Sequence, residues 1–427
     1  MGILIKNGHV VDPESGKNDI FDILIEGDVI SRVEKDIEPG EHDMVDATNC
    51  VVMPGFVDLH VHFREPGFEY KETIYTGSRA AARGGVTSVF PMPNTKPVAD
   101  SVEMINQINE IAARDSVVNI FQVGSVTKGQ AGIEPTDIAG FKQAGVIAIS
   151  EDGKSVMNSN VYRDAMRMAA ENDILVMAHC EDINLVNGGA MNAGAHADKL
   201  GIKGISNAVE DVITARDILL AKETGARLHL CHCSTADSVR MVAQAKKDGI
   251  RVSAEVCPHH FTLCDEDIVT DNADFKMNPP LRSKSDVKAL IEGLRDGTME
   301  VISTDHAPHS EEEKKRPIAK APFGITGIET SFCIAYTELV LKGVLTLEQL
   351  VEKMSCNPAR IAGIDRGTLL PGKTADIVVA NLDEEYIIDR NDFVSKGKNT
   401  PFDGKKVRGI IEYTFVSGKE VYKRRKI

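Results

Sequence analysis

Between residues 54 and 363 the sequence alternates short, strand-like apolar runs with longer helical stretches. Eight runs occur, at 55–62, 87–91, 118–124, 146–150, 174–179, 227–232, 251–256 and 300–304. Strands that alternate with helices indicate parallel βαβ units, and eight of them favour a closed barrel. An open, doubly wound sheet would require a glycine-rich phosphate loop after its first strand, and the sequence has none there. The predicted fold class is therefore α/β, with a (β/α)8 barrel of the TIM type.

The two ends of the chain have a different pattern. Residues 1–53 contain short runs rich in β-branched residues, such as Asp22–Ile25, separated by turn-forming residues. Similar runs return near the other end, for example at Ala375–Ala380. We therefore expect residues 1–53 and 364–427 to form one small, β-sandwich-like domain beside a barrel that spans residues 54–363.

Composition excludes several classes of partner. The formal net charge of −15 argues against a nucleic-acid surface, which needs clustered Lys and Arg. No apolar run reaches the roughly 18 residues of a membrane span, and the N-terminus lacks a signal-peptide pattern. The eight cysteines are too few for a disulfide framework in a chain of this length, which favours reduced thiols. We expect a cytoplasmic protein with no nucleic-acid or membrane partner.

Histidine and aspartate residues stand at or just after the ends of five of the eight predicted strands. Because side chains at i and i+2 of a strand share a face, the two histidines of the first strand point the same way. The carboxyl ends of barrel strands meet on the face where active sites lie. A single His or Asp at a strand end is commonly a packing residue or a helix cap. Six such residues at the ends of five strands instead favour one shared site. The six are His60, His62, Asp152, His179, His232 and Asp305.

Four imidazoles and two carboxylates form a nitrogen and oxygen site that suits zinc or a similar divalent ion. Six ligands are too many for one tetrahedral zinc, but they suit two metals with a carboxylate between them. Cys180, Cys231 and Cys233 stand beside the histidines, and strand alternation predicts that they point away and pack in the core. His259 and His260, after the seventh run, are interpreted as structural residues.

Four motifs together resemble one known family. They are His60–Gly67, Pro91–Thr95, Ser303–His309 and Gly367–Gly372. These motifs resemble the dihydroorotases, specifically the longer class I type within the cyclic amidohydrolases, and the resemblance covers essentially the whole chain. It implies a binuclear zinc centre of two Zn²⁺ per chain, bridged by Asp152 and a hydroxide or water. It places His60, His62 and Asp305 on one ion, and His179 and His232 on the other.

One position departs from many relatives. Hydantoinases and allantoinases carry a carboxylated lysine as the bridge, whereas this chain has Asp152 there. Lys154 shares a face with Asp152 if the segment is extended, so it is the second candidate for the bridge. Asp152 is favoured because it needs no modification.

The resemblance implies the reversible cyclisation of N-carbamoyl-L-aspartate to (S)-dihydroorotate in pyrimidine biosynthesis. Zinc-bound water can lose a proton near pH 7, and Asp305 is the candidate general acid and base. Arg64 can hold a substrate carboxylate in a bidentate fork, with Asn94 supplying amide donors beside it. The implied substrate-binding residues are His62, Arg64, Asn94, Asn278, His309, Phe323 and Gly324.

Two other functions compete with this interpretation. The first is a hydantoinase or dihydropyrimidinase, a cyclic amide hydrolase whose neutral substrate would not need Arg64. The second is a non-catalytic barrel that serves as a scaffold for a transcarbamoylase, against which all six candidate ligands speak. The sequence leaves open a homodimer, an association with aspartate transcarbamoylase, the number of bound metals, and whether residues 310–322 form a closing lid.

Overall fold

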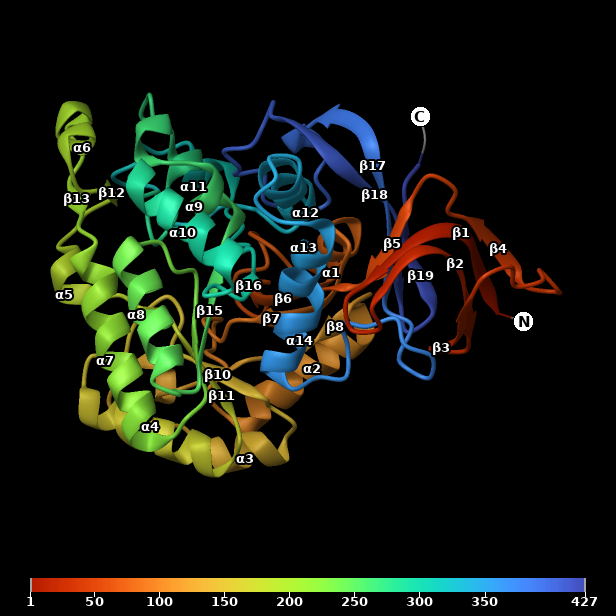
Figure 1. Ribbon diagram of the computed structural model, residues 1–427. Coiled ribbons are helices and arrows are strands. Elements are labelled where there is room, and N and C mark those ends of the chain that lie inside the picture. Colours follow the sequence, from red (N-terminus) through yellow and green to blue (C-terminus); the bar gives the residue numbers. More distant parts are fainter. Residues whose placement is uncertain (1, 426–427) are drawn as a thin grey trace.

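The computed structural model describes residues 2–425, and one eight-stranded sheet in it joins the two ends of the chain (Figure 1). The sheet has the order β19-β18-β17-β5-β1-β2-β3, with β4 beside β1. Its strands are β1 (Ile3–Asp12), β2 (Lys17–Glu26), β3 (Val29–Glu34), β4 (Asp43–Asp46), β5 (Val51–Pro54), β17 (Ile377–Ile387), β18 (Lys406–Val416) and β19 (Lys419–Lys423). Strands β5 and β17 pair antiparallel, so the two ends meet inside the sheet.

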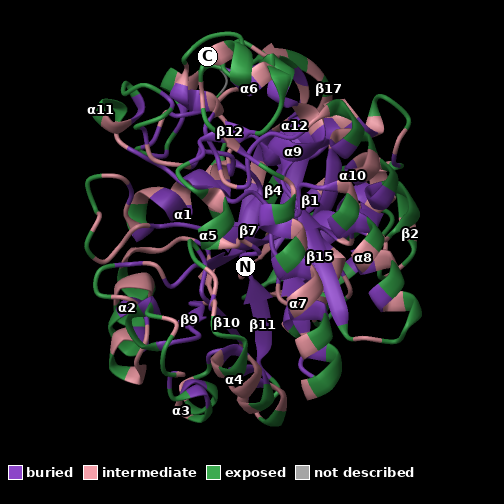
Figure 2. Ribbon diagram, turned by 90° about the vertical axis from the view of Figure 1, so that its left-hand side faces the viewer, coloured by how far each residue is buried: buried purple, intermediate pink, exposed green. Residues whose placement is uncertain are grey.

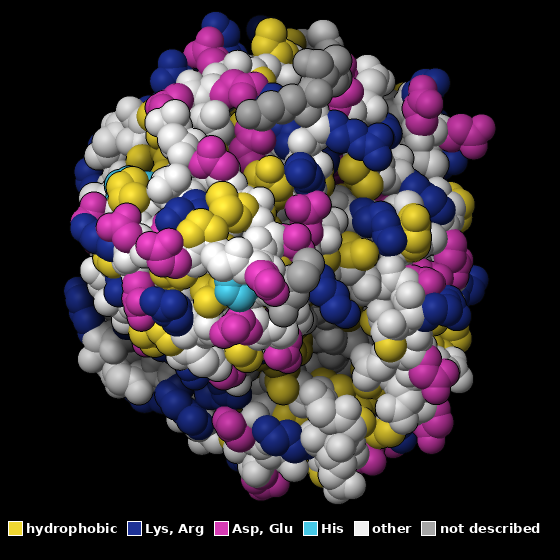
Figure 3. All heavy atoms as spheres, turned by 90° about the vertical axis from the view of Figure 1, so that its right-hand side faces the viewer, with side chains coloured by type: hydrophobic (Ala, Val, Ile, Leu, Met, Phe, Trp, Pro, Cys, Tyr) yellow, Lys and Arg dark blue, Asp and Glu magenta, His cyan; other side chains and the backbone are white. Residues whose placement is uncertain are grey.

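Apolar side chains from both ends form a core of their own against this sheet. Ile5, Ile23, Val52, Ile377 and Phe415 are among the buried members of that cluster. The shared core explains why the terminal segments associate, because neither contains enough apolar surface alone to form a stable unit. On the face that carries this sheet, basic and acidic side chains are interspersed (Figure 3).

The middle of the chain supplies short parallel strands that correspond to all eight predicted runs. They are β6 (Phe56–Val61), β7 (Val86–Pro91), β8 (Asn119–Ile120), β9 (Gly124–Ser125), β10 (Ala148–Ser150), β11 (Leu175–Ala178), β14 (Leu228–Leu230), β15 (Val252–Val256) and β16 (Val301–Ile302). The third run contains β8 and the first residue of β9. The pairing order is β6-β7-β8 in one sheet and β16-β15-β14-β11-β10-β9 in another. A parallel bridge between Val61 and His306 connects the end of β6 to the segment after β16.

Helices follow most of these strands and cover them. Figure 2 shows strands β7, β11 and β15 buried, while helices such as α7 and α8 expose one side to solvent. The longer helices are α1 (Ile74–Arg83), α2 (Val102–Asp115), α4 (Ser159–Glu171), α7 (Ala208–Thr224), α8 (Ala236–Lys247) and α10 (Lys284–Asp296). Polar caps start them at defined residues: the Thr73 side chain accepts from Thr76 N at α1, and Ser283 accepts from Asp286 N at α10.

Shorter elements complete the chain. The short helices are α3 (Ile138–Gln143), α5 (Ile183–Val186), α6 (Ala195–Leu200), α9 (Pro258–Thr262), α11 (Glu311–Lys314), α12 (Ser331–Ala335), α13 (Leu347–Val351) and α14 (Asn357–Ala362). Strands β12 (Met191–Asn192) and β13 (Gly204–Ile205) form a small parallel pair. The 3-10 helices are η1 (Lys128–Gln130), η2 (Asp265–Asp267), η3 (Ala273–Phe275) and η6 (Arg390–Asp392), and the π-helices are η4 (Tyr336–Val340) and η5 (Glu352–Cys356). In the part of the chain described, no helix has the length and apolarity that crossing a membrane requires.

Candidate metal centre and active site

The six residues predicted as metal ligands lie together at the carboxyl ends of the parallel strands. Asp152 occupies the middle, and its carboxylate oxygens lie 3.2 Å from His60 Nε2, 3.4 Å from His62 Nε2, 3.3 Å from His179 Nδ1 and 3.6 Å from His232 Nε2. All of these side chains are buried. One carboxylate therefore contacts four imidazoles that three different strands bring to the site.

Asp305 lies on the side of this group that carries His60 and His62. Its Oδ1 is 3.1 Å from His62 Nε2 and 3.6 Å from His60 Nε2. Burial alone would raise the pKa of Asp305, but the hydrogen bond with His62 and the nearby imidazoles lower it to about 2. Asp305 is therefore ionised at neutral pH.

The backbone turns sharply where two of these residues leave their strands. His232 follows β14 with φ 36°, and Asp305 follows β16 with φ 48°. Such positive φ angles are uncommon for residues other than glycine and often mark functional turns. In both cases the turn comes within three residues of the end of the strand, and the side chain lies in the shared cluster.

Two atoms of the cluster lack the hydrogen bonds that buried polar atoms normally make. His60 Nε2 and Asp152 Oδ1 are both buried without a partner, although they lie 3.2 Å apart. Burial would raise the pKa of Asp152, but His60 and the other imidazoles hold it well below its usual range. Unpartnered nitrogen and carboxylate lone pairs in one buried cluster fit divalent metal ions such as zinc.

Glu255 in β15 supports two of the candidate ligands, and the sequence analysis missed it. The fully buried carboxylate accepts hydrogen bonds from His60 Nδ1 at 2.9 Å, His229 Nε2 at 3.0 Å and His232 N at 3.1 Å. Burial would raise its pKa, yet the bonds with His229 and His60 hold that pKa well below the usual value. A carboxylate that orients a ligating imidazole in this way is common around metal sites. The available signal was a charged residue inside the apolar run Val252–Val256, where it needs partners.

The other ligand imidazoles also have fixed partners. His62 Nδ1 lies 3.0 Å from Asn94 Oδ1, and His179 Nε2 lies 3.2 Å from Glu181 Oε2. Asn278 Nδ2 donates to Glu181 Oε1 at 2.9 Å. The structure thus places Asn94 and Asn278 in contact with the ligand network.

Cys231 is a buried member of an apolar core cluster, as predicted, but it also lies beside the centre, so the prediction that it points away from the histidines is wrong. Its sulfur, a His60 nitrogen and a Glu255 oxygen all lie within 4.8 Å of one another. Strand alternation does not reach Cys231, because β14 ends at Leu230 and the backbone has turned by His232. The prediction of buried packing is confirmed for Cys180 and Cys233, which are members of the main apolar core.

Lys154, the second candidate for the bridge, does not share a face with Asp152. Gly153 between them has φ 82°, so the segment is not extended and the i, i+2 rule does not apply. The Lys154 side chain is exposed and its Nζ donates to Gln130 O at 3.1 Å.

Arg64, His309 and Phe323 form a second group beside the cluster. Arg64 Nε donates to Pro308 O at 3.2 Å, and Arg64 Nη2 lies 3.4 Å from His309 Nε2. His309 Nε2 donates to Phe323 O at 2.7 Å, and Lys71 Nζ donates to His309 Nδ1 at 3.2 Å. Burial and the charges of Arg64 and Lys71 lower the pKa of His309 to about 2, so the imidazole is neutral. Lys71 was not predicted; it stands in a polar stretch that carries no motif.

The segment after His309 is anchored to this group. Ser310 caps helix α11, and buried Lys314 at its end donates to Lys276 O, Pro322 O and, at 2.8 Å, Gly324 O. Glu313 also forms an ion pair of 3.0 Å with Lys71. These contacts hold the Phe323–Gly324 backbone in place; the closing lid stays a prediction.

Comparison with known proteins gives consistent matches. A family model described as dihydro-orotase-like matches residues 49–238. The dihydroorotase of Caldanaerobacter subterraneus subsp. tengcongensis is 47% identical over 426 residues, covering 100% of this chain and 98% of that protein. The dihydroorotase of Pelotomaculum thermopropionicum is 49% identical over 427 residues, covering 100% of both.

Solved structures of related hydrolases share the fold. The dihydropyrimidinase from Brevibacillus agri superposes with a TM-score of 0.88 at 25% identity, covering 99% of this chain and 95% of that one. The L-hydantoinase from Arthrobacter aurescens gives 0.89 at 26% identity, covering 100% and 97%.

Parallel strands that carry buried imidazoles and carboxylates at their carboxyl ends define an enzyme of the cyclic amidohydrolase class. Within that class, identity close to one half extends over the full length of the chain. The chain belongs to the dihydroorotase family.

Proposed function

We propose that this enzyme catalyses the reversible cyclisation of N-carbamoyl-L-aspartate to (S)-dihydroorotate, a step of pyrimidine biosynthesis. The observation that carries the proposal is the Asp152-centred cluster of four imidazoles, with the Arg64 guanidinium two residues beyond His62. The cluster suits amide chemistry, and the guanidinium suits a substrate that carries a carboxylate.

The parallel strands are proposed to close into a (β/α)8 barrel over residues 54–363. Support comes from the pairing order, because β8 and β9 follow each other closely in the chain and the Val61–His306 bridge connects the end of the first strand to the segment after the last. Residues 1–53 and 364–427 are proposed to form the second, β-sandwich-like domain, since their strands share one sheet and one core.

The residues that would hold two metals divide into two sets around Asp152. His60, His62 and Asp305 would bind one ion, His179 and His232 the other, and Asp152 would contact both. Two zinc ions in such a centre supply a nucleophilic hydroxide for hydrolysis and polarise the reacting carbonyl. His60 Nδ1 bonds to Glu255, which leaves His60 Nε2 free to act as a ligand.

Asp305 is proposed to move the proton that ring closure requires. When the ureido nitrogen of carbamoyl aspartate attacks the side-chain carboxyl carbon, an N–C bond forms, a C–O bond breaks and the nitrogen loses a proton. The departing oxygen leaves as water, which takes up that proton and one more from solvent. The Asp305 carboxylate is ionised at neutral pH and can accept that proton. In the reverse direction it returns the proton to the ring nitrogen.

Arg64 is proposed to bind the substrate carboxylate that does not react. Its Nε is held by Pro308 O, which fixes the plane of the guanidinium and leaves the Nη atoms to donate. Neutral His309 beside it adds no charge, and its orientation is fixed by Phe323 O and Lys71. Selectivity for a ring that carries a carboxylate, over an uncharged ring, would therefore come from Arg64.

A dihydropyrimidinase is the second candidate, because the solved structures above carry that name at 25–26% identity. Purified enzyme assayed with dihydroorotate and with dihydrouracil separates the two functions. Loss of a charged contact costs about 2–5 kcal/mol, so we expect dihydroorotate to have a kcat/KM at least about 30-fold higher. Faster turnover of dihydrouracil would contradict the proposal.

Other features of the protein stay predictions. Cysteines such as Cys231, Cys257 and Cys333 carry free thiols, which fit a reducing compartment, and hence a cytoplasmic location. A homodimer and an association with aspartate transcarbamoylase are expectations from the family resemblance alone.

A further inference from the structure

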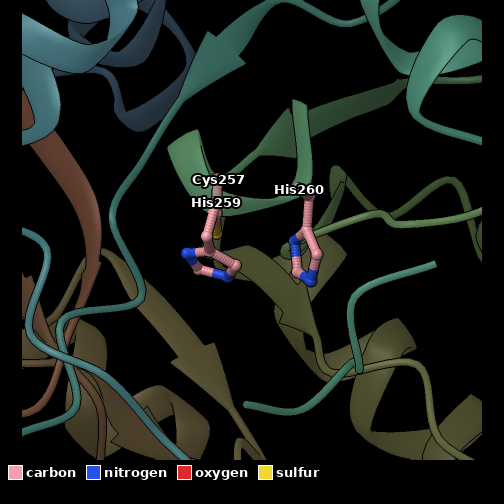
Figure 4. A group of neighbouring side chains, drawn as sticks. All are labelled: Cys257, His259 and His260. Carbon is pink, nitrogen blue, oxygen red and sulfur yellow. The ribbon is translucent and has the colours of Figure 1, made fainter. Parts of the chain in front are cut away.

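A second group of metal-binding side chains lies just after β15, separate from the six residues above. Cys257 follows the last residue of the strand, and His259 and His260 stand in the short helix α9 (Figure 4). Their ligand atoms all lie within 4.8 Å of one another, and all three side chains are at least 98% buried. We propose that Cys257, His259 and His260 bind a further divalent metal ion of the zinc type.

His260 presents a free lone pair to this group. Its Nε2 lies 2.9 Å from Pro279 O, and because a carbonyl oxygen can only accept, Nε2 carries the hydrogen. In the neutral ring Nδ1 is then an acceptor, and His260 Nδ1 is buried without any partner. Burial lowers the pKa of His260 to about 4, which agrees with a neutral ring.

His259 contributes a second unpartnered nitrogen. Its Nε2 is buried and makes no hydrogen bond, and its ring centroid lies 4.2 Å from that of His260. Figure 4 shows the two rings extending from α9 in the same direction, with the Cys257 sulfur beside His259. A buried polar atom without a hydrogen bond lowers the free energy of unfolding by about 1–3 kcal/mol. Two such nitrogens in one group are explained if they bind the same ligand. The sequence alone favours a structural role for this pair, whereas the two free nitrogens favour ligation.

A thiolate and two imidazoles suit zinc, which binds sulfur and nitrogen in tetrahedral sites and often leaves one position open. Binding requires the Cys257 thiol to lose its proton, so one S–H bond breaks, one metal–sulfur bond forms and one proton is released to solvent. Burial raises the pKa of this thiol well above its usual value, so the thiolate forms only together with the metal. Glu255 and Asp305 both act electrostatically on Cys257 and would offset the positive charge that remains.

Cobalt substitution tests the proposal, because sulfur ligation gives cobalt a charge-transfer band in the near ultraviolet. The full chain is stripped of metal, reloaded with Co²⁺ and compared with the variants Cys257→Ser and Cys231→Ser. Cys231 is the matched control, since it is a buried cysteine whose sulfur lies within 4.8 Å of a nitrogen of the candidate ligand His60. We expect the band in the unsubstituted protein and in Cys231→Ser, and its loss in Cys257→Ser together with one metal ion per chain.

Two results would overturn the proposal: no charge-transfer band in the unsubstituted protein, or a band that survives Cys257→Ser and disappears in Cys231→Ser. Anomalous diffraction from crystals of the unsubstituted, zinc-loaded enzyme gives an answer that does not depend on how the variants fold. A peak at bonding distance from Cys257 Sγ supports the site. Peaks confined to the Asp152 cluster refute it.

Discussion

Glu255→Gln removes a negative charge and one acceptor oxygen beside the candidate metal centre, while the size and shape of the side chain stay nearly the same. Glu255 accepts two imidazole hydrogen bonds through its two oxygens, from His60 and from His229. Glutamine has only one acceptor oxygen, so its amide NH2 must face one of the two donating nitrogens. The substitution therefore loses one of these two hydrogen bonds, and the one that remains is no longer made to a charged group, so the support of His60 is weakened.

The size of the effect follows from that lost bond. A hydrogen bond to a charged group contributes about 1.5–3 kcal/mol, which corresponds to about 10- to 150-fold in affinity. Loss of such an outer partner of a metal ligand usually costs about 10- to 100-fold in metal affinity or activity. We therefore expect Glu255→Gln to weaken zinc binding by about 10- to 100-fold.

The assay is a zinc titration of metal-stripped enzyme against a competing chelator, with circular dichroism to verify folding. Glu72→Gln is the matched control, because Glu72 is equally buried and lies 3.5 Å from His306, which is not a candidate ligand. The control should bind zinc as the unsubstituted enzyme does. Unchanged affinity in Glu255→Gln, or an equal loss in both variants, would refute the reasoning.

Three further substitutions test other parts of the site. Asp152→Ala should lose zinc and activity, whereas Lys154→Ala should keep both. Elemental analysis together with an activity assay measures this, and the reverse pattern would make Lys154 the bridge. Arg64→Met should lower kcat/KM for dihydroorotate by about 30-fold or more, since a lost charged contact costs about 2–5 kcal/mol, and spare residual turnover of dihydrouracil. An equal loss on both substrates with zinc retained would make Arg64 structural. The folded pKa of His309 is about 2, so only the unfolded chain takes up this proton as pH falls below about 6.5. The free energy of unfolding should therefore fall as the pH is lowered from about 6.5 to 5. In denaturant titrations, His309→Gln should make this fall shallower by up to about 1.4 kcal/mol per pH unit. Equal dependence of the unfolding free energy on pH in the two proteins would contradict a neutral His309.

Strand periodicity predicted much of the site because it depends only on local geometry. His60 lies in β6 and His62 one residue beyond the end of that strand, and both contact Asp152 as the i, i+2 rule predicts. The same rule failed where the backbone stops being extended. Cys231 lies beyond the end of β14, and Gly153 turns the chain before Lys154. A single sequence does not show where each strand ends to within one residue.

Residues whose role depends on distant neighbours were not predicted. Glu255 supports the site only because His60 and His229, from other strands, lie beside it in the fold. Lys71 likewise has a role only because His309, which is distant in sequence, lies beside it. Strand β4, at Asp43–Asp46, was also missed, because four residues with mostly exposed side chains carry no apolar pattern. It forms only because β1 offers a free edge beside it.

The dependence of ring closure on metal tests the central claim most directly. The rate of carbamoyl aspartate cyclisation is measured for enzyme as purified, after removal of metal by a chelator, and after zinc is added back. If the cluster around Asp152 is the catalytic metal centre, removal abolishes cyclisation and zinc restores it. Full activity in a metal-free preparation would contradict that assignment.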